Sequence, residues 1–179
     1  FGDGAANIGG FHEAMNMAQL YKLPVVFLCQ NNRYGEHTKF ADHTDSPDIS
    51  GRAAGYGMKG IKVDGNDVNA VYPAMEEAVE HARSGKGPVL VEAMCYRMMG
   101  HFFGSDFSYM PEEHLAEMQA EDPLPKLRKV MLEHQFTEDE LDKIVADIDA
   151  EIDEAVEDAL NAPLPDTDEI YKDVMEEIA

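Results

Sequence analysis

Short apolar runs alternate with longer helical patterns over the first 97 residues, and this alternation is the strongest constraint on the fold. Three runs have the character of buried strands, at residues 25–30, 61–63 and 89–97. Helical segments lie between them, near residues 9–21 and 67–84. Strands that alternate with helices of this length predict βαβ units and a parallel sheet. Because the runs are mainly apolar rather than strictly alternating, we expect an α/β fold in which helices cover both faces of the sheet.

The sequence after residue 110 has helical character alone. Pro111 opens one helix, and proline is well suited to a first turn. Thr137 and Glu140 have the spacing of a capping box and predict the start of a longer helix. Behind this box, apolar residues recur at helical spacing: Leu141, Ile144, Val145, Ile148, Ile152, Val156 and Leu160. A last short helix is predicted near residues 168–178.

The net charge of −22 is concentrated in this helical part, because residues 112–179 hold 23 acidic and 5 basic side chains. So negative a surface repels nucleic acid and anionic membranes, and neither is an expected partner. The acidic residues form solvated helix faces, an adaptation to salt, or a docking surface for a basic partner. We expect an α/β core over residues 1–110 and an acidic helical extension over 111–179 that packs on the core or on a partner subunit.

Two cysteines, Cys29 and Cys95, lie inside the predicted strands. Structural disulfides are rare in the cytosol, so we interpret both residues as buried thiols of a cytoplasmic protein. The chain starts with Phe1 directly before a glycine-rich turn, which indicates a fragment whose N-terminal part is missing.

The segment from Gly2 to Tyr34 carries the clearest chemical signal. Glycines on both sides of Asp3 let the backbone approach a phosphate closely, and the helix that follows directs N–H groups at an anion. Mg²⁺ prefers about six oxygen ligands, and the Asp3 carboxylate, the Asn32 amide oxygen and a backbone carbonyl are suitable members. Asn32 follows the predicted strand at residues 25–30, and Asp3 follows what would be the end of a truncated strand. The carboxyl ends of parallel strands form the ligand-binding edge of such sheets. The sequence therefore predicts a magnesium diphosphate site.

The pairing of Gly-Asp-Gly with Asn-Asn resembles the signature of thiamine diphosphate enzymes. More narrowly, residues 1–35 are similar to the alpha subunits of pyruvate, branched-chain 2-oxo acid and acetoin dehydrogenases. The likeness continues through KVDGNDV and RSGKGPVLVEAMCYR into the helical part, so it covers nearly the whole chain. It implies a diphosphate-binding domain with thiamine diphosphate and Mg²⁺ as cofactors.

The resemblance also implies roles for individual positions. Asp3 and Asn32 match the side chains that bind Mg²⁺, and Tyr34 matches the residue that binds it through the backbone carbonyl. Gly4 and Ala5 match residues whose backbone lies against the diphosphate. The first asparagine of the pair, before Asn32, matches a structural residue rather than a ligand.

A second motif follows the last predicted strand. In the family that this chain resembles, a Gly-His pair opens a loop over the cofactor, and His101 matches this histidine. An imidazole suits proton transfer near neutral pH, so His101 is the predicted catalytic residue, and the resemblance implies that it lies beside the cofactor. Arg97 is expected to order the loop or to place a charge near the phosphates.

The same loop departs from the pyruvate type of subunit, which carries a serine directly after the histidine. Here Phe102 follows, and Phe102–Gly104 resembles the loop of acetoin-type subunits. Ser105 is inserted before Asp106, and Met99 replaces a basic residue or histidine. Acetoin is therefore the expected substrate, and pyruvate or a branched-chain 2-oxo acid is the alternative.

Other polar residues fit less well. His12, His37 and His43 have no regular ligand spacing, so no transition-metal site is predicted. Glu13 is expected at a helix cap or a subunit contact, since the activating glutamate of the family belongs to the beta subunit.

The resemblance implies an oxidoreductase of α2β2 composition. The beta subunit would complete the site, and a lipoyl-bearing acyltransferase would accept the two-carbon unit. A function of another class is a non-catalytic interaction module whose acidic helices are the working surface. A transketolase-like enzyme is a further alternative.

Overall fold

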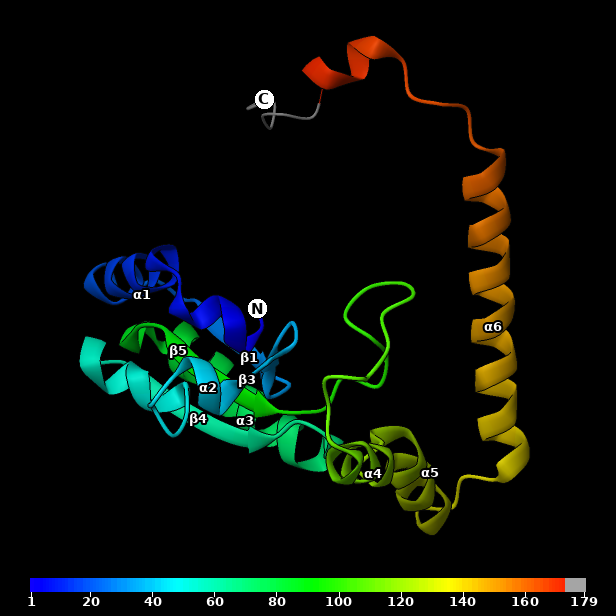
Figure 1. The fold of residues 1–179 in the computed structure, drawn as a ribbon, viewed down its shortest axis with the longest axis horizontal. Coiled ribbons are helices and arrows are strands. Elements are labelled where there is room, and N and C mark those ends of the chain that lie inside the picture. Colours follow the sequence, from blue (N-terminus) through cyan, green and yellow to red (C-terminus); the bar gives the residue numbers. More distant parts are fainter. Residues whose placement is uncertain (173–179) are drawn as a thin grey trace. The chain divides into compact units, whose positions relative to one another are not determined.

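The computed structural model describes residues 1–172, and it divides the chain into two compact units. The first unit is Phe1–Val130, which contains the sheet and the candidate site, and the second begins at Met131. Figure 1 shows the elements of each unit, and the two are described separately.

The first unit is built on three parallel strands, β1 (Val26–Asn31), β4 (Lys59–Asp64) and β5 (Val89–Met94), in the order β1-β5-β4. The predicted parallel sheet and the α/β fold are thus confirmed. The prediction that the last strand reaches residue 97 is wrong. Its final residue, Met94, pairs with the final residue of each neighbour, so no strand remains beside it to bond residues 95–97 as a strand.

A fourth stretch of backbone lies on the free side of β1. The amide of Gln30 donates to the carbonyl of Phe1 over 2.8 Å, and Gly2 forms an isolated parallel bridge with Gln30. Residues 1–2 therefore run alongside β1 in the same direction. This pairing brings the turn that follows Gly2 to the edge of the sheet where β1 ends.

Helices cover both faces of the sheet, as the apolar strands predict (Figure 1). Helix α1 (Gly9–Leu20) and the short helix η2 (Ser50–Tyr56) pack on one face, and α3 (Val68–His81) packs on the other. Side chains alternate along β5. Leu90 belongs to a core with Phe11, Met15, Cys29, Ile49, Ala53 and Met58, whereas Val89 and Val91 pack with Ala78, Met75, Leu28 and Ile61.

Strand β4 lies at the edge of the sheet and is alternately half-buried and exposed. Gly60 leaves room for η2, since a Cβ on this residue would lie 2.3 Å from the Ser50 carbonyl oxygen. The following helix α3 is capped by Asp67, whose side chain accepts from the amide of Asn69 over 2.9 Å.

The connection between β1 and β4 contains elements that the sequence did not predict. A short hairpin, β2 (Tyr34–Gly35) and β3 (Thr38–Lys39), is followed by the single turn α2 (Phe40–His43). Before α1, the turn η1 (Asp3–Asn7) begins directly after the Gly2 bridge. These short elements gather at the carboxyl edge of the sheet.

Two helices follow the loop after β5. Pro111 directly precedes α4 (Glu112–Ala120), as predicted, and α5 (Pro123–Glu133) comes next.

The second unit contains α6 (Glu138–Asn161), which begins with the predicted Thr137–Glu140 capping box. Within its apolar stripe, Leu141 is buried, whereas the members from Ile144 to Leu160 are exposed. The turn η4 (Thr167–Tyr171) starts where the last helix was predicted, and the remainder of that prediction lies outside the described residues. Among the described helices, none combines the length and apolar character that a membrane span requires.

Candidate active site

Asp3 lies at the carboxyl edge of the sheet, and its side chain is almost entirely buried. Because Gly2 is bridged to Gln30, the next residue on each strand, Asp3 and Asn31, follows at the same edge. Asn31 is the last residue of β1, and Asn32 comes directly after it. The structure thus brings the two halves of the predicted site together, as expected for neighbouring parallel strands.

Gly4 lies in close backbone contact with Gly35 of the hairpin. A Cβ on Gly4 would lie 3.1 Å from the Gly35 Cα, and a Cβ on Gly35 would lie 3.3 Å from the Gly4 Cα. A side chain at either position would push η1 and β2 apart. The two glycines therefore let the Tyr34–Gly35 backbone lie against the turn that carries Asp3, and we call this close contact the backbone cradle.

The two asparagines turn the chain sharply after β1. The Asn31 side-chain oxygen accepts from the amide of Arg33 over 2.9 Å, and the Asn32 oxygen accepts from the amide of Tyr34 over 3.1 Å. Arg33 adopts a positive φ of 70° within this turn. An amide oxygen has two lone pairs, so the Asn32 oxygen retains acceptor capacity for a cation.

Sequence reasoning missed Glu92, a fully buried carboxylate in the middle of β5. Its Oε1 accepts from the side-chain amide of Asn31 over 2.7 Å. Its Oε2 accepts from the backbone amides of Ile49 and Ser50 over 2.9 and 2.8 Å. Glu92 therefore joins the asparagine turn to the start of η2. The available signal was a charged residue within an otherwise apolar run, since a buried charge requires partners.

Asp3 also has a partner that the sequence did not predict. The Nε2 atom of His43 lies 3.4 Å from the Asp3 Oδ2 atom. The His43 side chain is 17% exposed, and it reaches Asp3 because α2 returns from the hairpin to η1. His12 and His37 lie elsewhere, since His12 contacts Tyr56 and His37 stacks on Tyr109 with ring centroids 4.5 Å apart.

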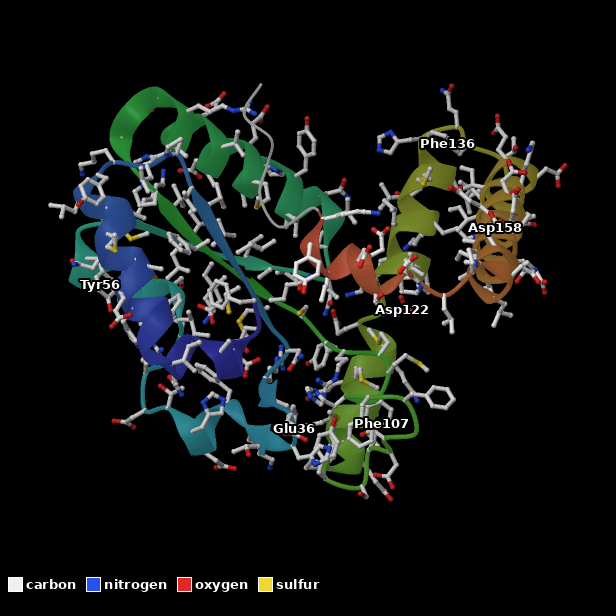
Figure 2. All side chains as sticks on the ribbon, turned by 90° about the horizontal axis from the view of Figure 1, so that it is seen from above. Glu36, Tyr56, Phe107, Asp122, Phe136 and Asp158 are labelled. Carbon is white, nitrogen blue, oxygen red and sulfur yellow. The ribbon has the colours of Figure 1, made fainter. Side chains whose placement is uncertain are left out.

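The hairpin anchors the loop that follows β5. The Tyr34 hydroxyl lies 2.9 Å from the Nδ1 atom of His114 on α4, and its ring meets that of Tyr109 edge-on at 5.5 Å. Arg97 donates from Nη2 to the Glu36 carbonyl over 3.3 Å and to the Tyr109 hydroxyl over 3.2 Å. Figure 2 shows Glu36 and Phe107 on the same side of the unit, away from Tyr56. The expectation that Arg97 orders the loop agrees with these contacts.

His101 is exposed, and its Nδ1 atom lies 2.7 Å from Nη1 of Arg97. A guanidinium can only donate, so Nδ1 is the acceptor and the ring proton is on Nε2. Gly100 is required here because a Cβ would lie 2.3 Å from the Ser105 carbonyl oxygen. The inserted Ser105 therefore closes the loop onto its own start, and the side chains of Phe102 and Phe103 are exposed.

Cys29 and Cys95 are both free thiols. Burial raises the pKa of Cys29 to about 12, and the nearby carboxylates of Glu92 and Asp3 act in the same direction. Burial also raises the pKa of Cys95. Neither thiol is therefore suited to nucleophilic chemistry at neutral pH.

Comparison with known proteins gives a family match over almost the whole chain. The family model described as dehydrogenase E1 component matches residues 1–168. The pyruvate dehydrogenase E1 component subunit alpha of Rhizobium meliloti (strain 1021) is 40% identical over 177 residues, which are 98% of this chain and 51% of that protein.

Two proteins of Bacillus subtilis (strain 168) are each 41% identical to the chain. The alpha subunit of acetoin:2,6-dichlorophenolindophenol oxidoreductase matches over 97% of this chain and 52% of its own length. The alpha subunit of 2-oxoisovalerate dehydrogenase matches over 91% of this chain and 50% of its own length. The chain thus spans about half the length of the curated relatives that it matches.

Proposed function

Because the chain belongs to the dehydrogenase E1 component family, we propose that it is the part of an alpha subunit that binds magnesium thiamine diphosphate. One observation carries this proposal. The Gly2–Gln30 pairing sets a buried Asp3 beside the Asn31–Asn32 turn, and the close contact of Gly4 with the hairpin supplies a backbone cradle at the same place.

The residues present fit such a group. The Asp3 carboxylate, the Asn32 amide oxygen and the Tyr34 carbonyl would hold Mg²⁺, which favours hard oxygen ligands. The backbone of Gly4 and Ala5 would lie against the diphosphate. Thiamine diphosphate, when bound, supplies a carbon nucleophile and an electron sink for breaking the bond beside a carbonyl. The chain's contribution is to bind and orient this cofactor.

His101 is proposed to serve proton transfer at the reacting centre. Its Nδ1 accepts from Arg97, so the Nε2–H of this exposed side chain would donate towards a bound substrate. Anchoring of Arg97 and Tyr109 on the hairpin keeps the base of this loop on the side of the unit where Tyr34 lies.

For the substrate we favour acetoin, because Phe102–Gly104 resembles the acetoin-type loop, with pyruvate or a branched-chain 2-oxo acid as the alternative. The names of the relatives include all three kinds of enzyme. A beta subunit would complete an α2β2 enzyme, and a lipoyl-bearing acyltransferase would accept the two-carbon unit. A cytoplasmic location also stays a prediction, since relatives include a chloroplastic and a mitochondrial protein.

The test is dye reduction by the full-length alpha chain copurified with its beta partner. Acetoin, pyruvate and 3-methyl-2-oxobutanoate are each assayed with and without Mg²⁺ and thiamine diphosphate. We expect cofactor-dependent turnover of acetoin that Asp3→Asn abolishes. The matched control, Asp153→Asn on the exposed surface of α6, should leave the rate unchanged.

Each alternative has its own outcome in this assay. Turnover of another substrate, with the same dependence on Asp3, would replace acetoin and leave the cofactor site standing. An assembled protein that binds no thiamine diphosphate at saturating Mg²⁺ would refute the proposal and favour the interaction module.

A further inference from the structure

We propose that His43 is a positioning residue for the Asp3 carboxylate. In this reading, which rests on the proposed function, its Nε2–H holds one carboxylate oxygen so that the other is presented to the cation. The observation behind it is the 3.4 Å approach of His43 Nε2 to Asp3 Oδ2 beside the Gly4–Gly35 contact. A Cβ on Gly35 would lie 3.6 Å from the same Nε2 atom, so the ring borders the cradle itself.

The side chain of Asn7 decides which nitrogen of His43 carries the proton. The Arg52 Nη2 atom lies 2.9 Å from the Asn7 oxygen, and a guanidinium can only donate. The Asn7 nitrogen lies 3.1 Å from the His43 backbone carbonyl, which can only accept. Both partners therefore fix the same orientation of the Asn7 amide.

With the amide fixed, its nitrogen donates to His43 Nδ1 over 3.0 Å. The Nδ1 atom is thus the acceptor, and the proton of a neutral ring sits on Nε2, facing Asp3. A buried carboxylate needs hydrogen bonds, and His43 supplies one to Oδ2. The second oxygen, Oδ1, is the one that we assign to the cation.

The Arg52 guanidinium braces the Asn7–His43–Asp3 hydrogen bonds by joining three separate segments. Arg52 on η2 also donates to the Ala6 carbonyl over 2.6 Å and to the Thr44 hydroxyl over 2.9 Å. The turn that carries Asp3, the end of α2 and the start of η2 are therefore held by one guanidinium. Hydrogen bonds of this kind to a metal-binding carboxylate fix its orientation, and their loss typically weakens metal binding about 10- to 100-fold.

The decisive variant is His43→Phe, which keeps an aromatic ring beside Phe40 and removes both ring nitrogens. The full-length alpha chain, assembled with its beta partner and saturated with thiamine diphosphate, is titrated with Mn²⁺ as the probe. Free Mn²⁺ is read by electron paramagnetic resonance, so no turnover is needed. We expect a dissociation constant about 10- to 100-fold higher than in the unchanged protein.

Two substitutions control for folding and for chemistry. His43→Gln places an amide N–H near the position of Nε2 and should restore binding to within a few-fold. His81→Phe, at the end of α3 on the opposite face of the sheet, should leave the dissociation constant unchanged. If His43→Phe does not assemble, His43→Asn takes its place, because its shorter amide does not reach Asp3.

The outcomes separate this inference from the function on which it rests. An unchanged protein that binds no Mn²⁺ in the presence of thiamine diphosphate would refute the cofactor site. Tight binding by the unchanged protein and equally tight binding by His43→Phe would overturn the role of His43 alone. In the fallback comparison, equal binding by His43→Asn and His43→Gln would overturn it too.

Discussion

Replacing Glu92 by glutamine should weaken the turn formed by Asn31 and Asn32, although it only exchanges one carboxylate oxygen for an N–H₂ group. Glu92 faces three donors, the side-chain amide of Asn31 and the backbone amides of Ile49 and Ser50. A glutamine offers one acceptor oxygen and one N–H₂ group. If its oxygen faces the two backbone amides, its nitrogen opposes the Asn31 nitrogen. If the Asn31 amide then flips, its nitrogen opposes the amide of Arg33. At least one donor–donor conflict remains in every arrangement.

A buried donor without an acceptor costs about 1–3 kcal/mol. A local opening made easier by that amount speeds amide exchange about 5- to 150-fold. Glu92→Leu removes the acceptor for all three donors, so its effect should be larger than that of Glu92→Gln. Leucine does not compensate through its apolar surface, because two of the orphaned groups belong to the backbone and cannot be replaced.

The assay is hydrogen–deuterium exchange of the peptide that contains the amides of Ile49 and Ser50, in the assembled protein. Glu76→Gln, on the exposed face of α3, is the matched control and should not alter the exchange. Equal exchange in the unchanged protein and in Glu92→Gln would refute the reasoning. So would equal effects of Glu92→Gln and Glu92→Leu, since the number of orphaned donors differs.

Further predictions concern stability and reactivity. Because the pKa of Cys29 is raised to about 12, we expect iodoacetamide to label this thiol at pH 8 at least about 100-fold more slowly in the folded protein than in urea. The same raised pKa means that the contribution of the protonated thiol to stability is complete below about pH 9 and is lost as the pH rises towards 12. Gly60→Ala should cost about 1–3 kcal/mol by forcing a Cβ against a backbone carbonyl of η2, whereas Gly55→Ala meets open space, and the midpoints of thermal unfolding should differ accordingly. Thr137→Ala should cost about 1 kcal/mol and speed amide exchange in the first turn of α6. Since Thr137 lowers the pKa of Glu140, acidification through that lowered pKa should loosen the same turn.

Local pattern was sufficient for the main elements of the fold. Each of these signals depends on residues only a few positions apart, as in the apolar runs, the Thr137 cap and the turns. The sequence therefore predicted the parallel sheet and most helices. The end of β5 was wrong because a strand ends where its neighbours end. Met94 has partners on both sides, and the side chains of residues 95–97 carry no information about where those partner strands end.

For the site, the glycine-flanked Asp3 and the Asn31–Asn32 pair were recognisable because both lie where a strand ends. Glu92 and His43 were not, since their partners come from distant segments. Glu92 acquires its role only when the fold brings residues 31 and 49 into contact with its side chain on β5. His43 lies 40 residues from Asp3 along the chain. The hairpin that brings His43 back has strands of two residues each, too short for a periodic signal.

Tyr34 serves two neighbours through different atoms, which has a thermodynamic consequence. Its backbone is proposed to bind the cation, while its hydroxyl contacts His114 on α4 and its ring contacts Tyr109 near the end of the loop after β5. Under that ligand set, cation binding and loop anchoring share one residue and are linked equilibria. If anchoring of the loop strengthens cation binding by a given free energy, then cation binding stabilises the anchored loop by the same free energy.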